Sequence, residues 1–258
     1  MDAPVGYLSS IQNWANQNDI EYADLMNEDN VKLVHFIGKD IVYFHLLFWP
    51  AMLKTYGINN LDEVFVHGFL TIEGSKMSKS KGNFILADKA LTFAHPDYYR
   101  YYLCSKLNTD ISDIDFSVDD FIQKINSDLI GKFINIGSRT QNFLVKLNSS
   151  KVASGNISKS LEFKKNYEEI ISLIDGKEYS KALKNIMNIA DKINAYVSTE
   201  EPWNKAKNDE ENECIAICSE ALNVFKDLTI LLQSFIPSIA DKIFSLLNVS
   251  ELNYDDLS

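Results

Sequence analysis

The sequence predicts an α/β region followed by an all-α region. Between residues 31 and 115, short β-branched and aromatic runs alternate with helical runs, as in folds built on parallel strands. From Ser117 onward, apolar residues recur with a period of about 3.6, which is typical of amphipathic helices. We therefore expect two domains, residues 1–115 and residues 116–258.

Composition narrows the class of protein. The chain has 258 residues, of which 46% are hydrophobic, so it has ample material for a buried core. We find no secretory-signal layout and no apolar run of membrane-spanning length that is free of charges. Three cysteines argue against a disulfide framework and for a reducing compartment. We expect a soluble, cytoplasmic protein that does not contact membranes.

The first half contains strand and helix signals in alternation. VKLVHFI predicts a strand that Gly38 ends, and DIVYFHLLFWPAMLK predicts a buried helix. A second pair of strands is expected in VFVHGFLTI, turning at Glu73-Gly74. HPDYYRYYLCSKL predicts a helix opened by Pro96 and Asp97, because both residue types suit a first turn.

The second half predicts a helical bundle. Ser117 and Asp120 have the spacing of a capping box, and one long helix is expected to follow them. Its apolar stripe comprises Ile122, Ile125, Leu129, Phe133, Ile136, Phe143 and Leu147. Further helical runs lie near 161–175, 179–197 and 212–235, with a short one to about 247. The Ser-rich stretch NSSKVASGNISKS predicts a loop between two of these helices.

The charge of the chain is unevenly distributed. Its net charge is −11, yet the segment from Lys124 to Lys151 carries four lysines and one arginine against a single acid, Asp128. Such a basic stripe is either an ordinary solvated helix face or a surface that holds nucleic acid. On the long helix, a polar ridge is expected opposite the apolar stripe, formed by Lys124, Asp128, Lys132, Asn135, Arg139, Asn142 and Lys146.

The stretch SKMSKSKGNF, residues 75–84, crowds lysines into a flexible turn that ends in glycine. Lysines on such a turn are suited to closing over a polyphosphate, although an exposed surface turn is the ordinary interpretation. KMSKS at 76–80 matches the signature loop of class I aminoacyl-tRNA synthetases. The stretches DAPVGYLSS, HFIGKDIVYFHLLFWPAML, NIGSR and EPW, at 2–10, 35–53, 135–139 and 201–203, closely resemble methionyl-tRNA synthetases.

This resemblance implies a fold and a reaction. The fold would be the C-terminal half of a Rossmann-type nucleotide-binding domain with the KMSKS loop, followed by an anticodon-binding helical bundle. The reaction would join methionine to ATP, used with Mg²⁺, as methionyl adenylate and then transfer the methionyl group to tRNA(Met). By the same resemblance, Lys76 and Lys79 are catalytic and meet the charge of the leaving pyrophosphate. Gly38 and Asp40 would contact the adenosine part of ATP or the adenylate.

Two further groups of residues follow from the resemblance. Ala3, Pro4, Tyr7, His45 and Trp49 would form the methionine pocket; His45 and Trp49 lie four apart and so share a helix face. Asn135, Arg139 and Trp203 would contact the anticodon, with Asn135 and Arg139 one helical turn apart. If the resemblance is set aside, the ordinary interpretation of Trp203 is a residue that packs between helices, and that of His45 is a core histidine.

The chain departs from the family pattern, also in lacking the family tryptophan two positions before the DAP motif. It contains no His-x-Gly-His string, which class I synthetases use for ATP, and no insertion carrying a zinc knuckle. Cys214 and Cys218 lie four apart on an apolar helix and indicate core packing, so we expect no metal site. The chain therefore looks like a C-terminal half that starts at an artificial methionine, without an appended dimerising domain. We expect it to be inactive alone but able to contact the tRNA anticodon.

Two other interpretations stay open. The chain could be a stand-alone tRNA-binding module without catalysis, which the missing ATP signature permits. It could instead be another nucleotidyl-transferring enzyme of the same superfamily, such as a pantothenate-type ligase. That class shares the lysine loop but has no reason to carry NIGSR and EPW.

Overall fold

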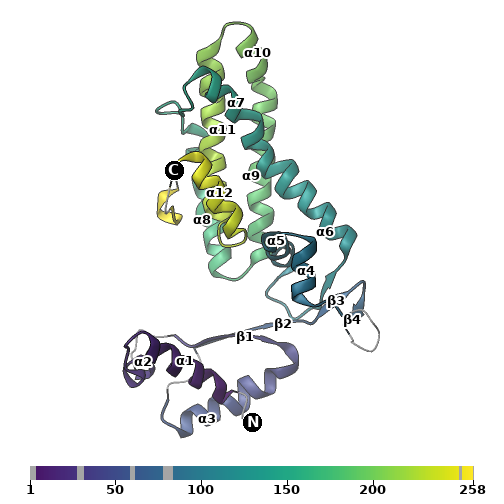
Figure 1. Cartoon of the computed structure of the whole chain (residues 1–258), viewed down its shortest axis with the longest axis vertical. Helices are drawn as coiled ribbons and strands as arrows, with labels where there is room; N and C mark the ends of the chain where they lie inside the picture. Colours follow the sequence, from purple (N-terminus) through teal and green to yellow (C-terminus); the bar gives the residue numbers. More distant parts are fainter. Residues whose placement is uncertain (1–3, 28–31, 59–61, 78–83, 250–251, 258) are drawn as a thin grey trace. The chain divides into compact units, whose positions relative to one another are not determined.

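The computed structural model describes residues 4–27, 32–58, 62–77, 84–249 and 252–257. The chain forms two compact units, one of residues Met1–Thr71 with Thr109–Ile114 and one of Ile72–Asn108 with Asp115–Ser258. Strands are confined to residues before Ser117 in the described chain, and helices follow (Figure 1). The predicted order, α/β and then all-α, is confirmed. The domain boundary near residue 116 stays a prediction.

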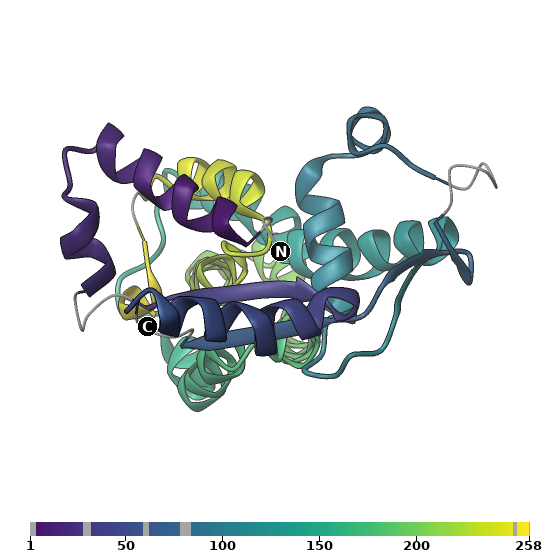
Figure 2. The ribbon, with the colours of Figure 1, turned by 90° about the horizontal axis from the view of Figure 1, so that it is seen from below.

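The first unit is built around two parallel strands. β1 (Val34–Gly38) pairs with β2 (Glu63–His67) in a register that sets Gly38 opposite His67. The crossover between them runs through η1 (Lys39–Ile41), π-helical η2 (Phe44–Phe48) and α3 (Trp49–Thr55). Seen from below, this crossover runs along the two strands (Figure 2). Two helices precede the strands, α1 (Val5–Gln17) and α2 (Tyr22–Asn27), for which the sequence carried no assigned signal.

The prediction of a buried helix over DIVYFHLLFWPAMLK is wrong. The segment divides into three helical types, and its buried residues are His45, Trp49 and Leu53, which lie four apart on one stripe. The other side is exposed: Tyr43 retains 75% and Leu47 60% of its surface. A sheet of two strands covers one side of the crossover, so apolar density along the sequence overstated how much of it is buried.

A second, three-stranded sheet has the order β4-β3-β5. β3 (Leu70–Ile72) and β4 (Ser75–Lys76) form a hairpin, and β5 (Ile114–Phe116) returns later in the chain. Glu73 and Gly74 have φ values of 48° and 72°, the two positive angles of a tight hairpin turn. The predicted turn is thus confirmed, but β2 pairs with β1 rather than with β3.

Two short helices lead from this sheet into the bundle. They are α4 (Ala87–Phe93) and α5 (Pro96–Lys106). α5 begins as predicted: Pro96 occupies the first turn, and the ring of His95 accepts a hydrogen bond from the backbone N–H of Asp97.

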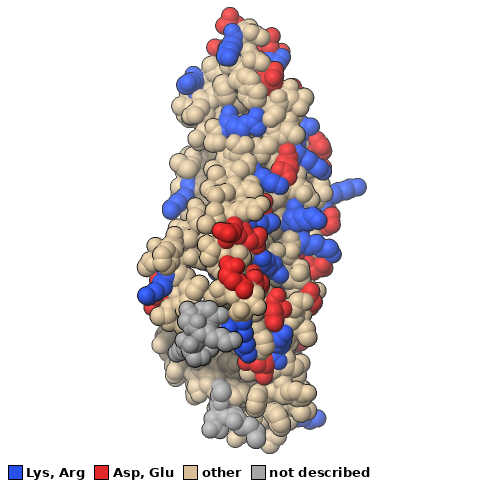
Figure 3. All heavy atoms as spheres, turned by 90° about the vertical axis from the view of Figure 1, so that its right-hand side faces the viewer, with Lys and Arg blue, Asp and Glu red and all other residues tan. Residues whose placement is uncertain are grey.

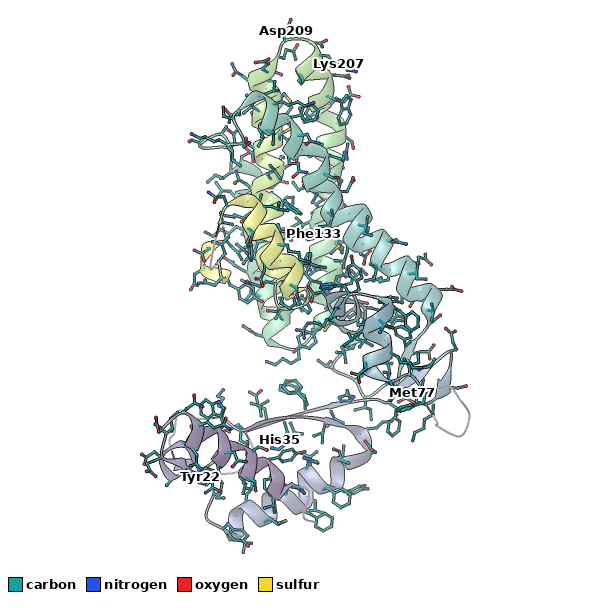
Figure 4. All side chains as sticks on the ribbon, viewed as in Figure 1. Tyr22, His35, Met77, Phe133, Lys207 and Asp209 are labelled. Carbon is teal, nitrogen blue, oxygen red and sulfur yellow. The ribbon has the colours of Figure 1, made fainter. Side chains whose placement is uncertain are left out.

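The helical bundle surrounds one buried helix, α11 (Glu211–Leu232), which packs against α7, α8, α9, α10 and α12 (Figure 1). The surrounding helices are α7 (Asn135–Leu147), α8 (Ser158–Asp175), α9 (Tyr179–Glu200), α10 (Pro202–Lys207) and α12 (Pro237–Leu247), before a final turn, η5 (Tyr254–Asp256). Phe133, which Figure 4 labels within the bundle, is fully buried. The predicted helical runs and the loop before α8 are confirmed.

The long helix after Ser117 is not uniform. It consists of α6 (Val118–Lys124), the π-helical segment η4 (Ile125–Ile134) and α7. The capping box is absent, because the Ser117 side chain caps no N–H of the helix and the Asp120 carboxylate accepts from the Tyr102 hydroxyl. α6 buries Phe121, and Ile122 is half exposed, so the expected stripe is displaced by one residue there.

The π-helical segment also changes the expected polar ridge. A π-helix has more residues per turn than an α-helix, so Ile125, Leu129 and Phe133, spaced by four, remain buried on one side. Asp128 does not belong to an exposed ridge: it is buried and accepts a hydrogen bond of 2.8 Å from the Tyr101 hydroxyl. Lys124 pairs with it at 2.9 Å.

No helix within the described ranges combines the length and apolar character that crossing a bilayer demands.

A buried carboxylate joins α5 to the last long helix. Asp97 is 1% exposed and accepts a hydrogen bond of 2.8 Å from the backbone N–H of Ile239, in the first turn of α12. Nearby, the Arg100 guanidinium donates to the carbonyl oxygen of Ser234 at 2.8 Å. The carboxylate therefore supplies the N-terminal cap that α12's own preceding residue, Ile236, lacks.

We predict that Asp97→Ala lowers the free energy of unfolding by about 1–3 kcal/mol, because it leaves a helix N–H buried and without its acceptor. Urea unfolding followed by far-UV circular dichroism measures this change. Asp241→Ala, which removes an exposed carboxylate from the same helix α12, is the matched control and should change little. Equal effects of the two substitutions would contradict the capping role of Asp97.

Candidate functional site

The carboxyl ends of β1 and β2 form an edge at which ligands commonly bind in parallel α/β folds. Gly38 and His67 end the two strands side by side, and the exposed Asp40 follows in η1. A Cβ atom at position 38 would lie 2.7 Å from Oδ1 of Asp40, so glycine allows the carboxylate to fold back over the strand end. The two residues predicted for the nucleotide are thus together at this edge.

His67 is an exposed residue of this edge that the sequence reasoning missed. Its Nδ1 lies 2.8 Å from the carbonyl oxygen of Gly68. The signal was present, because His67 directly precedes a glycine at the end of a predicted strand.

Gly68, directly after β2, packs closely against the backbone at Ser112. A Cβ atom at Gly68 would overlap the backbone carbonyl of Ser112, so the two backbones approach more closely than any side chain permits. The N–H of Phe69 donates to Oδ1 of Asp113 at 2.8 Å, and Lys39 pairs with the same oxygen at 2.7 Å.

Four rings gather between α1, β1 and the crossover. The Tyr7 hydroxyl lies 3.0 Å from Nε2 of His45, whose Nδ1 lies 3.0 Å from the carbonyl oxygen of Ile41. Trp49 meets Tyr7 edge to face at 6.3 Å, and His35 does so at 4.8 Å. The structure therefore brings together Tyr7, His45 and Trp49, three of the residues predicted for the amino-acid pocket.

The structure describes one of the other two residues predicted for the amino-acid pocket. Pro4 is buried directly before α1, and Ala3 lies outside the described residues. His35 was missed, although strand alternation signalled it: His35 and Ile37 occupy the buried face of β1.

The lysine-rich segment begins at the β3–β4 hairpin. Lys76 is exposed at the end of β4, while Lys79 lies outside the described residues. Figure 4 labels Met77 beside this hairpin. The turn is anchored on the chain that enters α6: the Glu73 carboxylate accepts from the N–H of Val118 at 3.1 Å, and the N–H of Gly74 donates to Asp115 at 2.8 Å.

Asn135, Arg139 and Trp203 form one half-buried cluster where α7, α9 and α10 meet. The guanidinium of Arg139 lies over the indole of Trp203, 5.4 Å from its centroid. The turn that brings Trp203 there has Glu201 in the left-handed conformation and Pro202 at the first helical position. Trp203 also packs on the bundle core, so it combines packing with an accessible surface.

Two residues of α9 orient this cluster, and the sequence reasoning missed both. Nδ2 of Asn135 donates to Oδ1 of Asn194 at 3.1 Å. Arg139 donates through Nη1 to the carbonyl oxygen of Asn194 at 3.3 Å and through Nη2 to the hydroxyl of Ser198 at 2.9 Å. Their spacing of four on a helix was the available signal, but nothing in the sequence showed which helix they face.

The glycine of NIGSR has a packing role. A Cβ atom at Gly137 would lie 3.2 Å from the Phe225 ring of α11, so glycine lets α7 approach the central helix closely. Phe133 meets the same ring at 4.8 Å. The motif therefore seats α7 on the core through Gly137 and presents Asn135 and Arg139 on another side.

Acidic side chains interrupt the basic stripe. On the face shown in Figure 3, Lys and Arg are interspersed with Asp and Glu. Lys124 pairs with Asp128 at 2.9 Å and Lys132 with Asp191 at 2.7 Å; outside the stripe, Lys205 of α10 contacts Glu210 and Glu213. Recognition by this bundle would therefore depend on the Asn135–Arg139–Trp203 cluster more than on a continuous positive face.

The cysteines of α11 are unsuited to metal binding. Burial raises the pKa of the Cys218 thiol to about 12 and also raises the pKa of Cys214, whereas metals bind the thiolate. Over the part of the chain that the structure describes, no group of three or more His, Cys, Asp and Glu side chains is placed to hold a metal ion.

Two protein-family models match the chain. Residues 1–141 match the family described as tRNA synthetases class I (M), and residues 150–257 match the anticodon binding domain of methionyl tRNA ligase. Methionine--tRNA ligases from Ralstonia nicotianae and Thiobacillus denitrificans are each 43% identical to the chain, over 98% and 99% of it. The chain spans 38% of the length of these curated relatives.

Solved structures resemble the chain as well. A Mycobacterium tuberculosis methionyl-tRNA synthetase in complex with methionyl-adenylate superposes with a TM-score of 0.77 at 27% identity, covering 86% of this chain and 45% of that one. The apo form of the Mycobacterium tuberculosis enzyme gives a TM-score of 0.72 at 26% identity, covering 86% and 44%.

We predict that Gly68→Ala destabilises the first unit by more than about 2 kcal/mol, because the added methyl group displaces a backbone carbonyl. Urea unfolding followed by tryptophan fluorescence measures this in a Trp203→Phe background, where Trp14 and Trp49 report on the first unit. Gly6→Ala is the control: it meets no atom within 4 Å and lies in α1. A Gly68→Ala variant as stable as the control would show that the close approach is not required.

Proposed function

Because the chain belongs to the family of class I tRNA synthetases of the methionyl type, we propose that it is part of a methionine–tRNA ligase. Such an enzyme activates methionine with ATP and attaches it to tRNA(Met). The observation that carries the proposal is the Asn135–Arg139–Trp203 cluster, in a chain whose two halves match the synthetase family and its anticodon domain. The chain supplies the anticodon contact and part of the nucleotide and amino-acid sites.

In the first step, a carboxylate oxygen of methionine attacks the α-phosphorus of ATP. The bond from that phosphorus to the oxygen bridging to the β-phosphate breaks, and pyrophosphate leaves with the added charge. Lys76 and Lys79 neutralise that charge, and removing one such donor commonly costs about 3–4 kcal/mol of transition-state stabilisation. ATP enters as its Mg²⁺ complex, which is the substrate of this step.

The carboxyl ends of β1 and β2 hold the adenosine. The exposed carboxylate of Asp40 accepts hydrogen bonds from the ribose hydroxyls, which is the usual role of an acid beyond such a strand. Gly38 lets that carboxylate and the ligand approach the backbone, since any Cβ at this position would crowd Asp40.

The ring cluster of the first unit holds methionine. Tyr7, His45 and Trp49 present ring edges and a hydroxyl, and a thioether sulfur gains roughly 0.3–1.5 kcal/mol at an aromatic edge. Pro4, buried directly before α1, would form a further wall of this pocket. These ring edges suit the thioether of methionine.

In the second step, a hydroxyl of the terminal ribose of tRNA attacks the carbonyl carbon of the adenylate, and AMP leaves. The bundle's part is to hold the anticodon. The indole of Trp203 stacks on an unpaired base, and Asn135 and Arg139 hydrogen bond to base edges. Asn194 and Ser198 hold the Arg139 guanidinium before RNA arrives, so little side-chain freedom remains to be lost on binding.

One observation favours a second candidate, a tRNA-binding module without catalysis. The 258 residues contain no His-x-Gly-His string, so one part of the ATP site expected in class I synthetases is absent from them. The anticodon cluster would serve such a module unchanged.

We predict that the 258-residue chain alone does not form methionyl adenylate, because it lacks that part of the ATP site. Methionine-dependent exchange of labelled pyrophosphate into ATP measures the reaction, with a full-length relative as the positive control. Exchange above background by this chain would overturn the expectation and favour an alternative way of binding ATP.

We predict that Trp203→Ala weakens binding of a tRNA(Met) anticodon stem-loop by about 1–3 kcal/mol, roughly 5- to 150-fold, because one base loses its stacking partner. Isothermal titration calorimetry measures the affinity, and circular dichroism checks that helix content is kept. Trp203→Phe should restore part of the binding. Trp14→Ala, which removes a half-exposed indole from α1, is the control. Unchanged affinity in Trp203→Ala would leave the indole with packing as its role.

A further inference from the structure

The hydrogen bonds of His45 fix its tautomer. The carbonyl oxygen of Ile41 can only accept, so Nδ1 of His45, 3.0 Å away, carries the proton. In the neutral ring Nε2 then accepts, and the Tyr7 hydroxyl at 3.0 Å donates to it. The lone pairs of the Tyr7 oxygen are left facing away from His45, available to a ligand in the pocket.

Deep burial does not hold Tyr7 in this position. α1 has one fully buried residue, Ala15, and Tyr7 itself is 39% exposed. The Tyr7 hydroxyl bonds to His45, and the Tyr7 ring meets the rings of His35, His45 and Trp49. Its orientation therefore depends on the rings around it.

His35 lies against both partners of the hydrogen bond. Its ring stands edge-on to Tyr7 at 4.8 Å and 77°, and edge-on to His45 at 5.5 Å and 61°. It comes from β1, on the side that faces the helices of this unit, where Figure 4 labels it. With 7% of its surface exposed, it is a rigid wedge between a strand and the two hydrogen-bonded rings.

The ring of His35 makes these contacts. Its Nε2 is buried and has no hydrogen-bond partner among the described residues. Burial, and then the neighbouring His45, lowers the pKa of His35, so the ring is neutral at pH 7.

We propose that His35 is a positioning residue: its ring holds the Tyr7 hydroxyl on Nε2 of His45 and so sets the geometry of the amino-acid pocket. Its consequence for methionine rests on the proposed function of that pocket. His35 acts through Tyr7 and His45. An aromatic ring without nitrogen, as in phenylalanine, makes the same edge-on contacts, whereas an aliphatic side chain does not.

The ¹⁵N signals of the His45 ring show which of its nitrogens carries the proton, and so whether the hydrogen bond from Tyr7 is kept. The chain has four histidines, so long-range ¹H–¹⁵N spectra resolve and assign each ring. We expect His45 to show a protonated Nδ1 and an accepting Nε2 in the unsubstituted chain and in His35→Phe. In His35→Leu and His35→Ala the two nitrogen signals of His45 should move toward each other, as its tautomers begin to interconvert.

Two comparisons separate positioning from general packing. Ile37→Ala removes a buried side chain from the same face of β1 and should leave the His45 signature intact. His35→Phe should not destabilise the unit, because it removes a buried nitrogen that has no partner. Loss of the signature in His35→Phe, its retention in His35→Leu, or equal loss in Ile37→Ala would each overturn the proposal.

Methionine titration tests the link to the pocket. We expect His35→Leu to weaken methionine binding by about tenfold, the scale of one hydrogen bond, and His35→Phe to keep it within about twofold. If methionine leaves the His45 signals of the unsubstituted chain unmoved while the His35→Leu signature is lost, the positioning role stands and the proposed methionine site fails. If methionine binds equally to the unsubstituted and His35→Leu chains, the positioning role fails and the methionine site stands.

Discussion

The bundle depends on the burial of α11 among the helices that surround it. Most of α11 is buried, so each surrounding helix is fixed by the face that it turns toward this core. α7 approaches most closely where Gly137 meets the Phe225 ring. Because Gly137 faces inward, Asn135 and Arg139 of the same motif are directed elsewhere, toward α9. The packing constraint at the core thus decides which polar groups reach the surface.

The surface that results is ordered before any ligand binds. Arg139 is held by two acceptors on α9 and by the ring of Trp203 on α10, so three helices converge on one guanidinium. The ring cluster of the first unit follows the same principle, since two hydrogen bonds orient His45 between Ile41 and Tyr7. In both places rigid elements fix the side chains, which reduces the entropy lost on binding.

Much of this architecture was readable from the sequence because it depends on local chemistry. Gly74 made a turn at a positive φ, and Pro96 opened its helix, each through a conformational preference of its own residue. The wrong predictions concern contacts between residues that are distant in the sequence. The exposed face of the crossover reflects how few strands cover it, and the burial of Asp128 reflects Tyr101, a residue of another helix. Asn194 was missed for the same reason, since periodicity shows that a position shares a helix face but not what that face meets. The prediction also assumed 3.6 residues per turn throughout, whereas the π-helical segment η4 has more residues per turn.

The anchoring of the Glu73 turn on Val118 gives the second unit a mechanical property. α6, η4 and α7 follow one another without a break, so a single rod has the lysine hairpin bonded to its first residue and Asn135 and Arg139 farther along it (Figure 1). Because these segments are continuous, a rotation of the helix about its axis at Asn135 and Arg139 would be carried to the residue that anchors the Glu73 turn.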